Sequence, residues 1–284
     1  MKKTQWLRNT LTSIRQHCPV DYKIKLLCIG TPDAELSQVL DEYAEVLTTI
    51  VSPINLGCGG GRNVLTRELS SELAMMLDDD MYLTRGAIEH ALNVFREHEE
   101  LGAIAYPSMS PKGQLFSGGG RHLIIKDGVI SKVHPSLDSR DLITLEDLDG
   151  GAMLLRTEML KDFRWDGRYM GGFDDLDKSL QIMYRSKWKQ AILPHERLIH
   201  DRSWVDQEQG YAAVRLNGLA IRKSYRLFRK KWRLRLSLRD HLYFELIYPM
   251  VTIVPWPGLR AGFDKFVREK RGTRHISFNV AEGS

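Results

Sequence analysis

The chain has 284 residues, of which 43% are hydrophobic, so it can bury the core of one large domain or two modest ones. Its longest uncharged apolar run near the C-terminus, residues 246–259, contains three prolines and is shorter than the roughly 20 residues of a membrane-spanning helix. Cys18, Cys28 and Cys58 are far apart, which argues against a zinc site or a disulfide framework. No apolar stretch follows the N-terminal lysines, so a cytoplasmic protein is expected.

The net charge of +5 is distributed unevenly. Residues 1–201 hold 24 Lys/Arg and 29 Asp/Glu, whereas residues 202–284 hold 17 and 7. Between Arg222 and Arg239, nine of eighteen residues are basic, none is acidic, and leucines and aromatic residues are interleaved. Such a segment is typical of a helix on an anionic membrane surface or against nucleic acid, or of a solvated helix with snorkelling side chains. The change in composition predicts a domain boundary near residue 202, followed by a mainly helical extension.

The first part of the chain shows alternating helical and strand periodicity. The expected elements are a helix at 6–14, a strand at 23–29, a helix at 36–43, a strand at 47–51 and a helix beginning near Arg62. This alternation predicts parallel strands. Residues 73–77 are continuously apolar, which is typical of a central strand covered on both faces, and three aspartates follow them.

The second part adds a strand pair that changes the expected sheet. Asp127-Gly128 lies between two alternating apolar runs at 122–133 and predicts a type I′ hairpin, so the sheet is mixed although mostly parallel. The other expected elements are a helix at 88–95, strands at 102–106 and 150–155, a helix at 176–184 and a strand at 191–193. Residues 118–120 are glycines that precede Arg121 and a strand, which predicts a loop beside a ligand rather than a dinucleotide motif.

Asp78, Asp79 and Asp80 form the first acidic cluster, at the end of an expected strand. Residues two apart in a strand point to the same side, so Asp78 and Asp80 can present their carboxylates together. Ligands of open α/β sheets bind at this edge, and Mg²⁺ and Mn²⁺ prefer oxygen ligands. The pattern therefore predicts a divalent-cation site, with an acidic helix cap or a solvated turn as the alternative.

Residues 171–177 form the second acidic cluster, at the start of an expected helix. A carboxylate in this cluster is a candidate general base, and the preceding Gly171 and Gly172 would let backbone or substrate approach closely. The helix dipole also stabilises acidic residues at this position, so a purely structural role is the alternative.

The order of these motifs resembles the family-2 inverting glycosyltransferases with the GT-A fold, over about residues 5–201. Four segments carry the resemblance: Asn55-Leu56-Gly57 with Gly61-Arg62-Asn63 matches the family's Asn-x-Gly, Arg-Asn element; Asp78-Asp79-Asp80 matches Asp-x-Asp; Phe173-Asp174-Asp175-Leu176-Asp177 matches Phe-Glu-Asp-x-Asp; and His200 matches a histidine that follows a short strand and a proline. Residues 1–201 are then the GT-A domain, and residues 202–284 the basic extension.

The resemblance implies an α/β fold and metal-dependent transfer of a sugar from a nucleotide-sugar, a UDP-sugar being favoured, to a glycan or a lipid-linked acceptor. It implies Asp175 as the general base with Asp174 beside it. It also implies two further groups of site residues. The ligands of Mn²⁺ or Mg²⁺ are Asp78, Asp80 and His200, and the donor-binding residues are Asn55, Gly57, Arg62, Asp78 and Asp79. A peripheral location on the cytoplasmic side of a membrane is expected.

The sequence departs from the family pattern near its beginning. The chain starts with the family's first helix, so the preceding strand and its turn are expected to be missing. Residues 28–33 stand where the family has an aspartate-rich turn, and the aspartate that contacts uracil is absent. Two alternatives therefore stay open: a catalytically silent GT-A-like module that binds a glycan, a membrane or a partner, and, less favoured, a protein directed to nucleic acid.

Overall fold

The computed structural model describes residues 2–139, 141–201 and 217–253. The described helices are α1 (Lys2–His17), α2 (Ala34–Glu42), α3 (Gly57–Leu65), α4 (Ala87–Glu97), α5 (Asp174–Arg185), α7 (Gly218–Trp232), α8 (Leu238–Leu242) and α9 (Tyr248–Ile253), with a 3-10 helix at Thr157–Lys161 and a π turn at Tyr243–Ile247. The described strands are β1 (Ile24–Ile29), β2 (Leu47–Ser52), β3 (Leu73–Leu77), β4 (Met81–Tyr82), β5 (Leu101–Ala105), β6 (Ser108–Met109), β7 (Leu115–Ser117), β8 (Gly120–Lys126), β9 (Val129–Val133), β10 (Ile143–Leu145), β11 (Asp147–Leu148), β12 (Ala152–Arg156), β13 (Lys189–Ile192), β14 (Leu198–His200) and β15 (Arg235–Leu236). The mixed α/β architecture expected from the sequence is confirmed.

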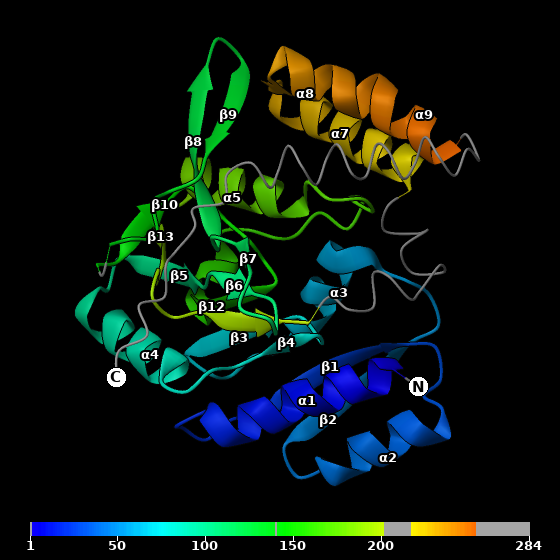
Figure 1. The fold of residues 1–284 in the computed structure, drawn as a ribbon, viewed down its shortest axis with the longest axis vertical. Coiled ribbons are helices and arrows are strands. Elements are labelled where there is room, and N and C mark those ends of the chain that lie inside the picture. The colour runs from blue at the N-terminus through cyan, green and yellow to red at the C-terminus, as the bar shows by residue number, and fades with distance from the viewer. Residues whose placement is uncertain (1, 140, 202–216, 254–284) are drawn as a thin grey trace.

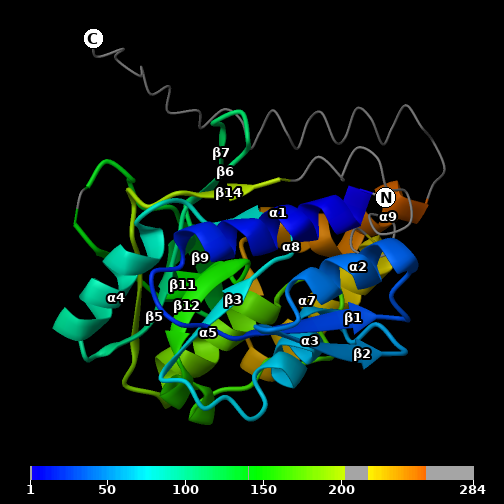
Figure 2. The ribbon, with the colours of Figure 1, turned by 90° about the horizontal axis from the view of Figure 1, so that it is seen from below.

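The N-terminal part forms a small layer of its own. β1 and β2 pair in parallel, from Ile24 opposite Leu47 to Ile29 opposite Ser52. Leucines and Val39 from α1, α2 and these strands share one apolar cluster. Figure 2 shows α1 and α2 over this strand pair and α3 below it. The alternation of helices and strands expected for this part of the chain is therefore confirmed.

The central sheet has the strand order β10-β13-β5-β12-β3. β3, β5 and β13 run in the same direction, as expected, but β12 lies antiparallel between β3 and β5. In the described sheet, β5 and β13 are therefore the one pair of neighbouring strands that run parallel. The central position expected for β3 is wrong, because β3 forms an edge. Alternate residues of β3 contact two different apolar clusters. The strand is continuously apolar because both of its faces are covered, although it has a neighbouring strand on one side only.

The C-terminal extension joins the core through the β8–β9 hairpin. Asp127 and Gly128 both have positive φ, at 50° and 70°, which confirms the type I′ turn. β15 pairs in parallel with β9, and α7 packs beside α5 (Figure 1). One apolar cluster contains residues from both sides of position 202: Ile130, Tyr169, Leu176, Leu180, Tyr225, Phe228, Leu234 and Leu236. The division into two domains stays a prediction. Within the described residues, no helix is both long enough and apolar enough to cross a bilayer.

Candidate active site

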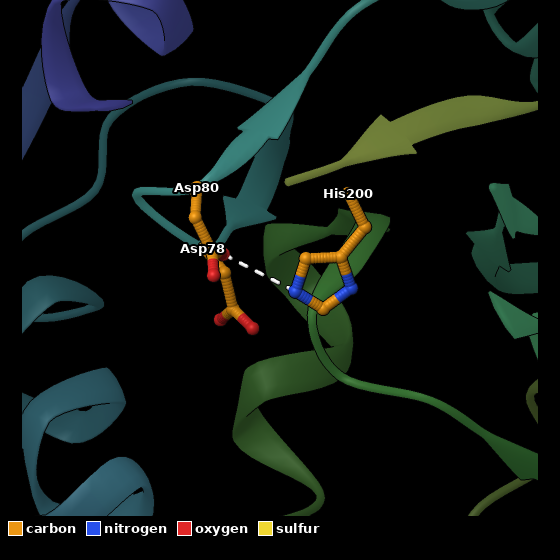
Figure 3. Close-up of side chains that lie close together, drawn as sticks. All are labelled: Asp78, Asp80 and His200. Atoms are coloured by element: carbon orange, nitrogen blue, oxygen red, sulfur yellow. Dashed lines mark ion pairs between the residues drawn. The ribbon is translucent and has the colours of Figure 1, made fainter. Parts of the chain in front are cut away.

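Asp78, Asp80 and His200 lie together just beyond the end of β3. Their potential ligand atoms are all within 4.8 Å of one another, and His200 Nε2 is 3.2 Å from Asp80 Oδ1 (Figure 3). The aspartates occupy a turn rather than a continued strand, yet the two carboxylates converge as expected. Carboxylates suit Mg²⁺ and Mn²⁺, and imidazole is a common ligand of transition ions. The three side chains therefore fit a divalent cation such as Mn²⁺.

Short strands hold this cluster in place. β14 brings His200 opposite Met81 of β4, and the N–H of Asp201 donates to the carbonyl of Asp80 at 2.9 Å. The ring of Phe116 lies edge-on to the His200 imidazole, with 6.0 Å between the ring centres. Asp80 is only 6% exposed, so its carboxylate is fixed in the protein interior. A buried carboxylate beside a second one favours a bound cation, because the cation compensates their charges.

Two glycines before β12 separate this cluster from a second group of charged residues. The N–H of Asp78 donates to the carbonyl of Gly151 at 2.8 Å, and a Cβ at Gly151 would lie 2.9 Å from Asp78 Oδ2. A Cβ at Gly150 would collide with the carboxylate of Asp175 and with the guanidinium of Arg62. Sequence reasoning treated this segment only as the start of a strand. The pair of glycines before an apolar run was the available signal.

Asp175 and Arg62 form the centre of the second group. Arg62, in α3, places Nη1 at 2.7 Å from Asp175 Oδ1 and 3.3 Å from Asp174 Oδ2. The N–H of Gly150 donates to Asp175 Oδ2 at 3.1 Å. Both carboxylates belong to the first turn of α5, where the helix dipole favours negative charge. The guanidinium of Arg62 also lies 5.9 Å from the centre of the Trp165 ring, which limits its freedom.

The two carboxylates of this group differ in pKa and in access. Burial, together with the charge of Asp175, raises the pKa of Asp174 to about 6. Burial also acts to raise the pKa of Asp175, but the cations of Arg62 and Lys178 outweigh it, and the net shift is below the usual value. The Asp175 side chain is 34% exposed and that of Asp174 only 10%. Asp175 therefore keeps its charge to a lower pH than Asp174 does, and it is the carboxylate that a ligand can reach more easily.

Buried polar contacts attach α5 to the rest of the molecule. Lys178 is fully buried and donates to the carbonyl of Leu148 at 3.0 Å, close to the Gly150 turn. Asp177 is also fully buried. Its carboxylate accepts from Tyr169 Oη at 3.2 Å, Gln181 Nε2 at 2.8 Å, Lys231 Nζ at 2.8 Å and Trp232 Nε1 at 2.7 Å. Two of these donors come from α7, so the C-terminal extension supports the helix that carries Asp175.

Phe173 precedes α5 in an uncommon backbone conformation. Its φ is 72°, in the left-handed region that residues other than glycine rarely occupy. Its ring packs against Tyr225, Phe228 and Phe244, with ring centres 5.3–5.5 Å apart. These three residues belong to the C-terminal helices and the π turn between them. Contacts from the extension thus fix the point at which α5 begins.

The remaining predicted donor-binding residues, Asn55, Gly57 and Asp79, take part in local contacts outside the two charged groups. Asn55 Oδ1 accepts from the N–H of Gly57 at 2.9 Å and so shapes the start of α3. Gly57 has φ 66°, and a Cβ there would contact Met170. Asp79 is exposed in the same turn as the metal-site carboxylates, and its carbonyl accepts from Thr10 Oγ1 at 2.9 Å. Their role in donor binding stays a prediction.

Comparisons with known proteins give a family and a fold. The model of a family described as glycosyl transferase family 2 matches residues 2–163. A comparison with curated proteins finds no match.

Two solved structures illustrate the shared fold. One is GalNAc-T7 with UDP, GalNAc and Mn²⁺, with a TM-score of 0.54, 13% identity, and coverage of 87% of this chain and 56% of that chain. Another is S. aureus TarS 1-349, with a TM-score of 0.54, 14% identity, and coverage of 99% of this chain and 92% of that chain. TarS 1-349 in complex with UDP is similar as well, with a TM-score of 0.51 and 13% identity. The chain thus spans little more than half of the first of these structures and nearly all of the second.

Proposed function

The chain belongs to glycosyl transferase family 2, and from this premise we propose that it is a metal-dependent inverting glycosyltransferase. Its donor is a nucleotide-sugar, with UDP as the favoured nucleotide, and its acceptor is a hydroxyl of a glycan or a lipid-linked molecule. The observation that carries the proposal is the pair of charged groups on either side of Gly150 and Gly151. One group fits a cation, and the other contains a reachable, ionised carboxylate.

Asp78, Asp80 and His200 are the residues that would hold Mn²⁺ or Mg²⁺. The cation, when bound, neutralises the negative charge that develops on the diphosphate leaving group. The solved structures whose names include UDP, and in one case Mn²⁺, support this assignment of donor and ion. Arg62, in the second charged group, supplies a further positive charge near the N-terminus of α5.

Asp175 is the proposed base. Its carboxylate takes the proton of the acceptor hydroxyl while that oxygen forms a bond to the anomeric carbon, and the bond from this carbon to the diphosphate oxygen breaks on the opposite side. Three observations support this role. Asp175 is the more exposed of the two carboxylates, it is ionised at neutral pH, and Arg62 and the Gly150 N–H orient both of its oxygens. Asp174 shares the Arg62 contact and supports this arrangement.

The proposed location is the cytoplasmic face of a membrane. A lipid-linked acceptor is presented at such a surface, and the basic residues between Arg222 and Arg239 are suited to anionic lipid.

Metal-dependent nucleotide binding provides the test of this function. We expect UDP with Mn²⁺ to raise the melting temperature, because a ligand at about 100 times its dissociation constant stabilises the folded state by about 2.7 kcal/mol. ADP and GDP are expected to have smaller effects. Asp80→Ala removes a ligand and should abolish the stabilisation, whereas Asp21→Ala, at an exposed position, should retain it. Equal stabilisation in the presence of a chelator, or in the Asp80 variant, would contradict the metal site.

The Gly150 turn provides a second test. We expect Gly150→Ala to lower kcat by about 10²-fold, because its methyl group displaces Asp175 or Arg62 and a small displacement at a reacting group has a cost of this size. Steady-state transfer of the sugar, or its hydrolysis from the donor, gives the measurement. Gly167→Ala is the matched control, because the nearest atoms to its new Cβ lie at an ordinary 3.5 Å. Full activity of the Gly150 variant would show that the turn does not position the base.

A further inference from the structure

The C-terminal helices present an outward surface that the catalytic proposal does not use. α8, the π turn and α9 form one continuous helix, Leu238 to Ile253, which lies beside α7 at the edge of the molecule (Figure 1). Tyr225 contacts His241, and Arg222, nearer the start of α7, contacts Glu245. The two helices are therefore antiparallel neighbours, and each leaves one side open to solvent.

The helix from Leu238 to Ile253 exposes a row of large apolar side chains. We call this row the apolar ridge: Leu238 (64% exposed), Leu242 (43%), Leu246 (52%), Ile247 (44%) and Met250 (63%). Four of its members are spaced four residues apart, so they lie on one side of the helix. Leu246 and Ile247 both belong to the π turn that precedes Pro249. The ridge extends over about 18 Å.

α7 exposes a parallel row of basic side chains. We call this row the basic ridge, and it consists of Lys223, Arg226 and Lys230. Positions three and four apart share one side of a helix. Glu245 offsets only part of this charge, because its single carboxylate is shared by Arg222, Arg226 and Arg229. Among residues 217–253, Asp240 is the one exposed acidic side chain, and it accepts a hydrogen bond from Ser237.

We propose that the apolar ridge and the basic ridge together bind an anionic lipid bilayer. Helices that lie in the membrane interface combine these features: apolar side chains enter the headgroup boundary while Lys and Arg contact anionic lipid. Charge favours this occupant over a second copy of the chain, since two copies would bring like-charged ridges together. The apolar ridge favours lipid over nucleic acid, because phosphate contacts leave five large apolar side chains in water.

Vesicle binding tests this surface without a catalytic measurement. The membrane proposal can therefore fail while the proposed function stands, and the proposed function can fail while the membrane proposal stands. The inference rests on the proposed function only for its membrane location. The full chain should co-sediment with vesicles of equal parts phosphatidylglycerol and phosphatidylcholine, and much less with phosphatidylcholine alone. Leu242→Ser/Leu246→Ser should weaken binding at least tenfold. Lys223→Gln/Lys230→Gln should weaken it about 25-fold, since each basic residue contributes about fivefold.

Matched variants elsewhere on the surface are the controls. Val20→Ser removes an apolar side chain that is 46% exposed, and Lys161→Gln removes an exposed charge outside both ridges. Both variants should bind vesicles as the unmodified chain does, and thermal unfolding checks that every variant is folded. Three results would overturn the proposal: equal binding to vesicles without anionic lipid, unchanged binding of the leucine variant, or loss of self-association in that variant without any effect on vesicles. Binding of a DNA oligonucleotide that only the lysine variant loses would instead assign the surface to nucleic acid.

Discussion

Asp175→Asn is expected to lower kcat for sugar transfer by between about 10² and 10⁴-fold, the usual contribution of a positioned general base. Asparagine has nearly the same shape as aspartate but cannot accept the proton of the acceptor hydroxyl. Its amide oxygen can still accept from Arg62 or from the Gly150 N–H, which contact Asp175 at 2.7 and 3.1 Å in the native chain. The variant should therefore fold normally. Initial rates at saturating donor and Mn²⁺ give the measurement.

Binding of UDP in the presence of Mn²⁺ distinguishes a loss of catalysis from a loss of donor binding. The shift in melting temperature caused by UDP with Mn²⁺ should be nearly the same in Asp175→Asn as in the native chain, because Asp175 is not a predicted metal ligand. Asp174→Asn is the matched control, since its carboxylate is less exposed and shares Arg62. A rate unchanged in Asp175→Asn but lost in Asp174→Asn would move the base to Asp174. A rate unchanged in both would place the base outside this acidic cluster and contradict the proposed mechanism.

Lys231→Met is expected to lower the free energy of unfolding by about 3 kcal/mol, because removing one partner of a buried ion pair leaves an uncompensated charge. The remaining partner, Asp177, is fully buried, and Lys231 Nζ lies 2.8 Å from its Oδ2. Urea titration followed by circular dichroism gives the free energy. We also expect activity to be lost at a lower temperature than in the native chain, since Asp177 lies in the first turn of α5 with the proposed base.

The neighbouring residue supplies the control for this prediction. Lys230 is exposed, so Lys230→Met removes the same charge and adds the same side chain without affecting Asp177. Its unfolding free energy should stay within about 0.5 kcal/mol of the native value. If both lysine variants lose the same amount, the effect comes from net charge, and the contact between α7 and α5 does not stabilise the fold.

The acidic strand end and the resemblance in motif order predicted that Asp78, Asp80 and His200 lie together. The aspartates that follow the apolar strand β3 place Asp78 and Asp80 together, and His200, at the end of β14, reaches the same place. The same run of apolar residues gave the wrong position for β3. The burial of a strand's two faces depends on the layers above and below the sheet. Its place in the sheet depends on which strands pair with it, and the composition of one strand does not give that information.

Other features of the site depend on contacts between distant parts of the chain. Gly150 and Asp175 are 25 positions apart in the sequence. The sequence therefore does not indicate that the Asp175 carboxylate approaches position 150 too closely for any residue except glycine. Phe173 has no local signal for a left-handed conformation, because the residues that surround its ring lie about 50 positions or more later. The extension looked like an appendage for the same reason: the donors of α7 to Asp177 become visible only when the helices are packed.

The glycine pair at 150–151 has a consequence for how substrate preference can vary in this protein. Main-chain atoms of this turn bond directly to Asp78 on one side and to Asp175 on the other. The spacing between the main chain of Asp78 and the carboxylate of Asp175, the proposed base, thus depends on hydrogen bonds to two residues without side chains. We therefore expect side-chain substitutions in the loops around the site to alter acceptor preference without changing the spacing between Asp78 and the proposed base.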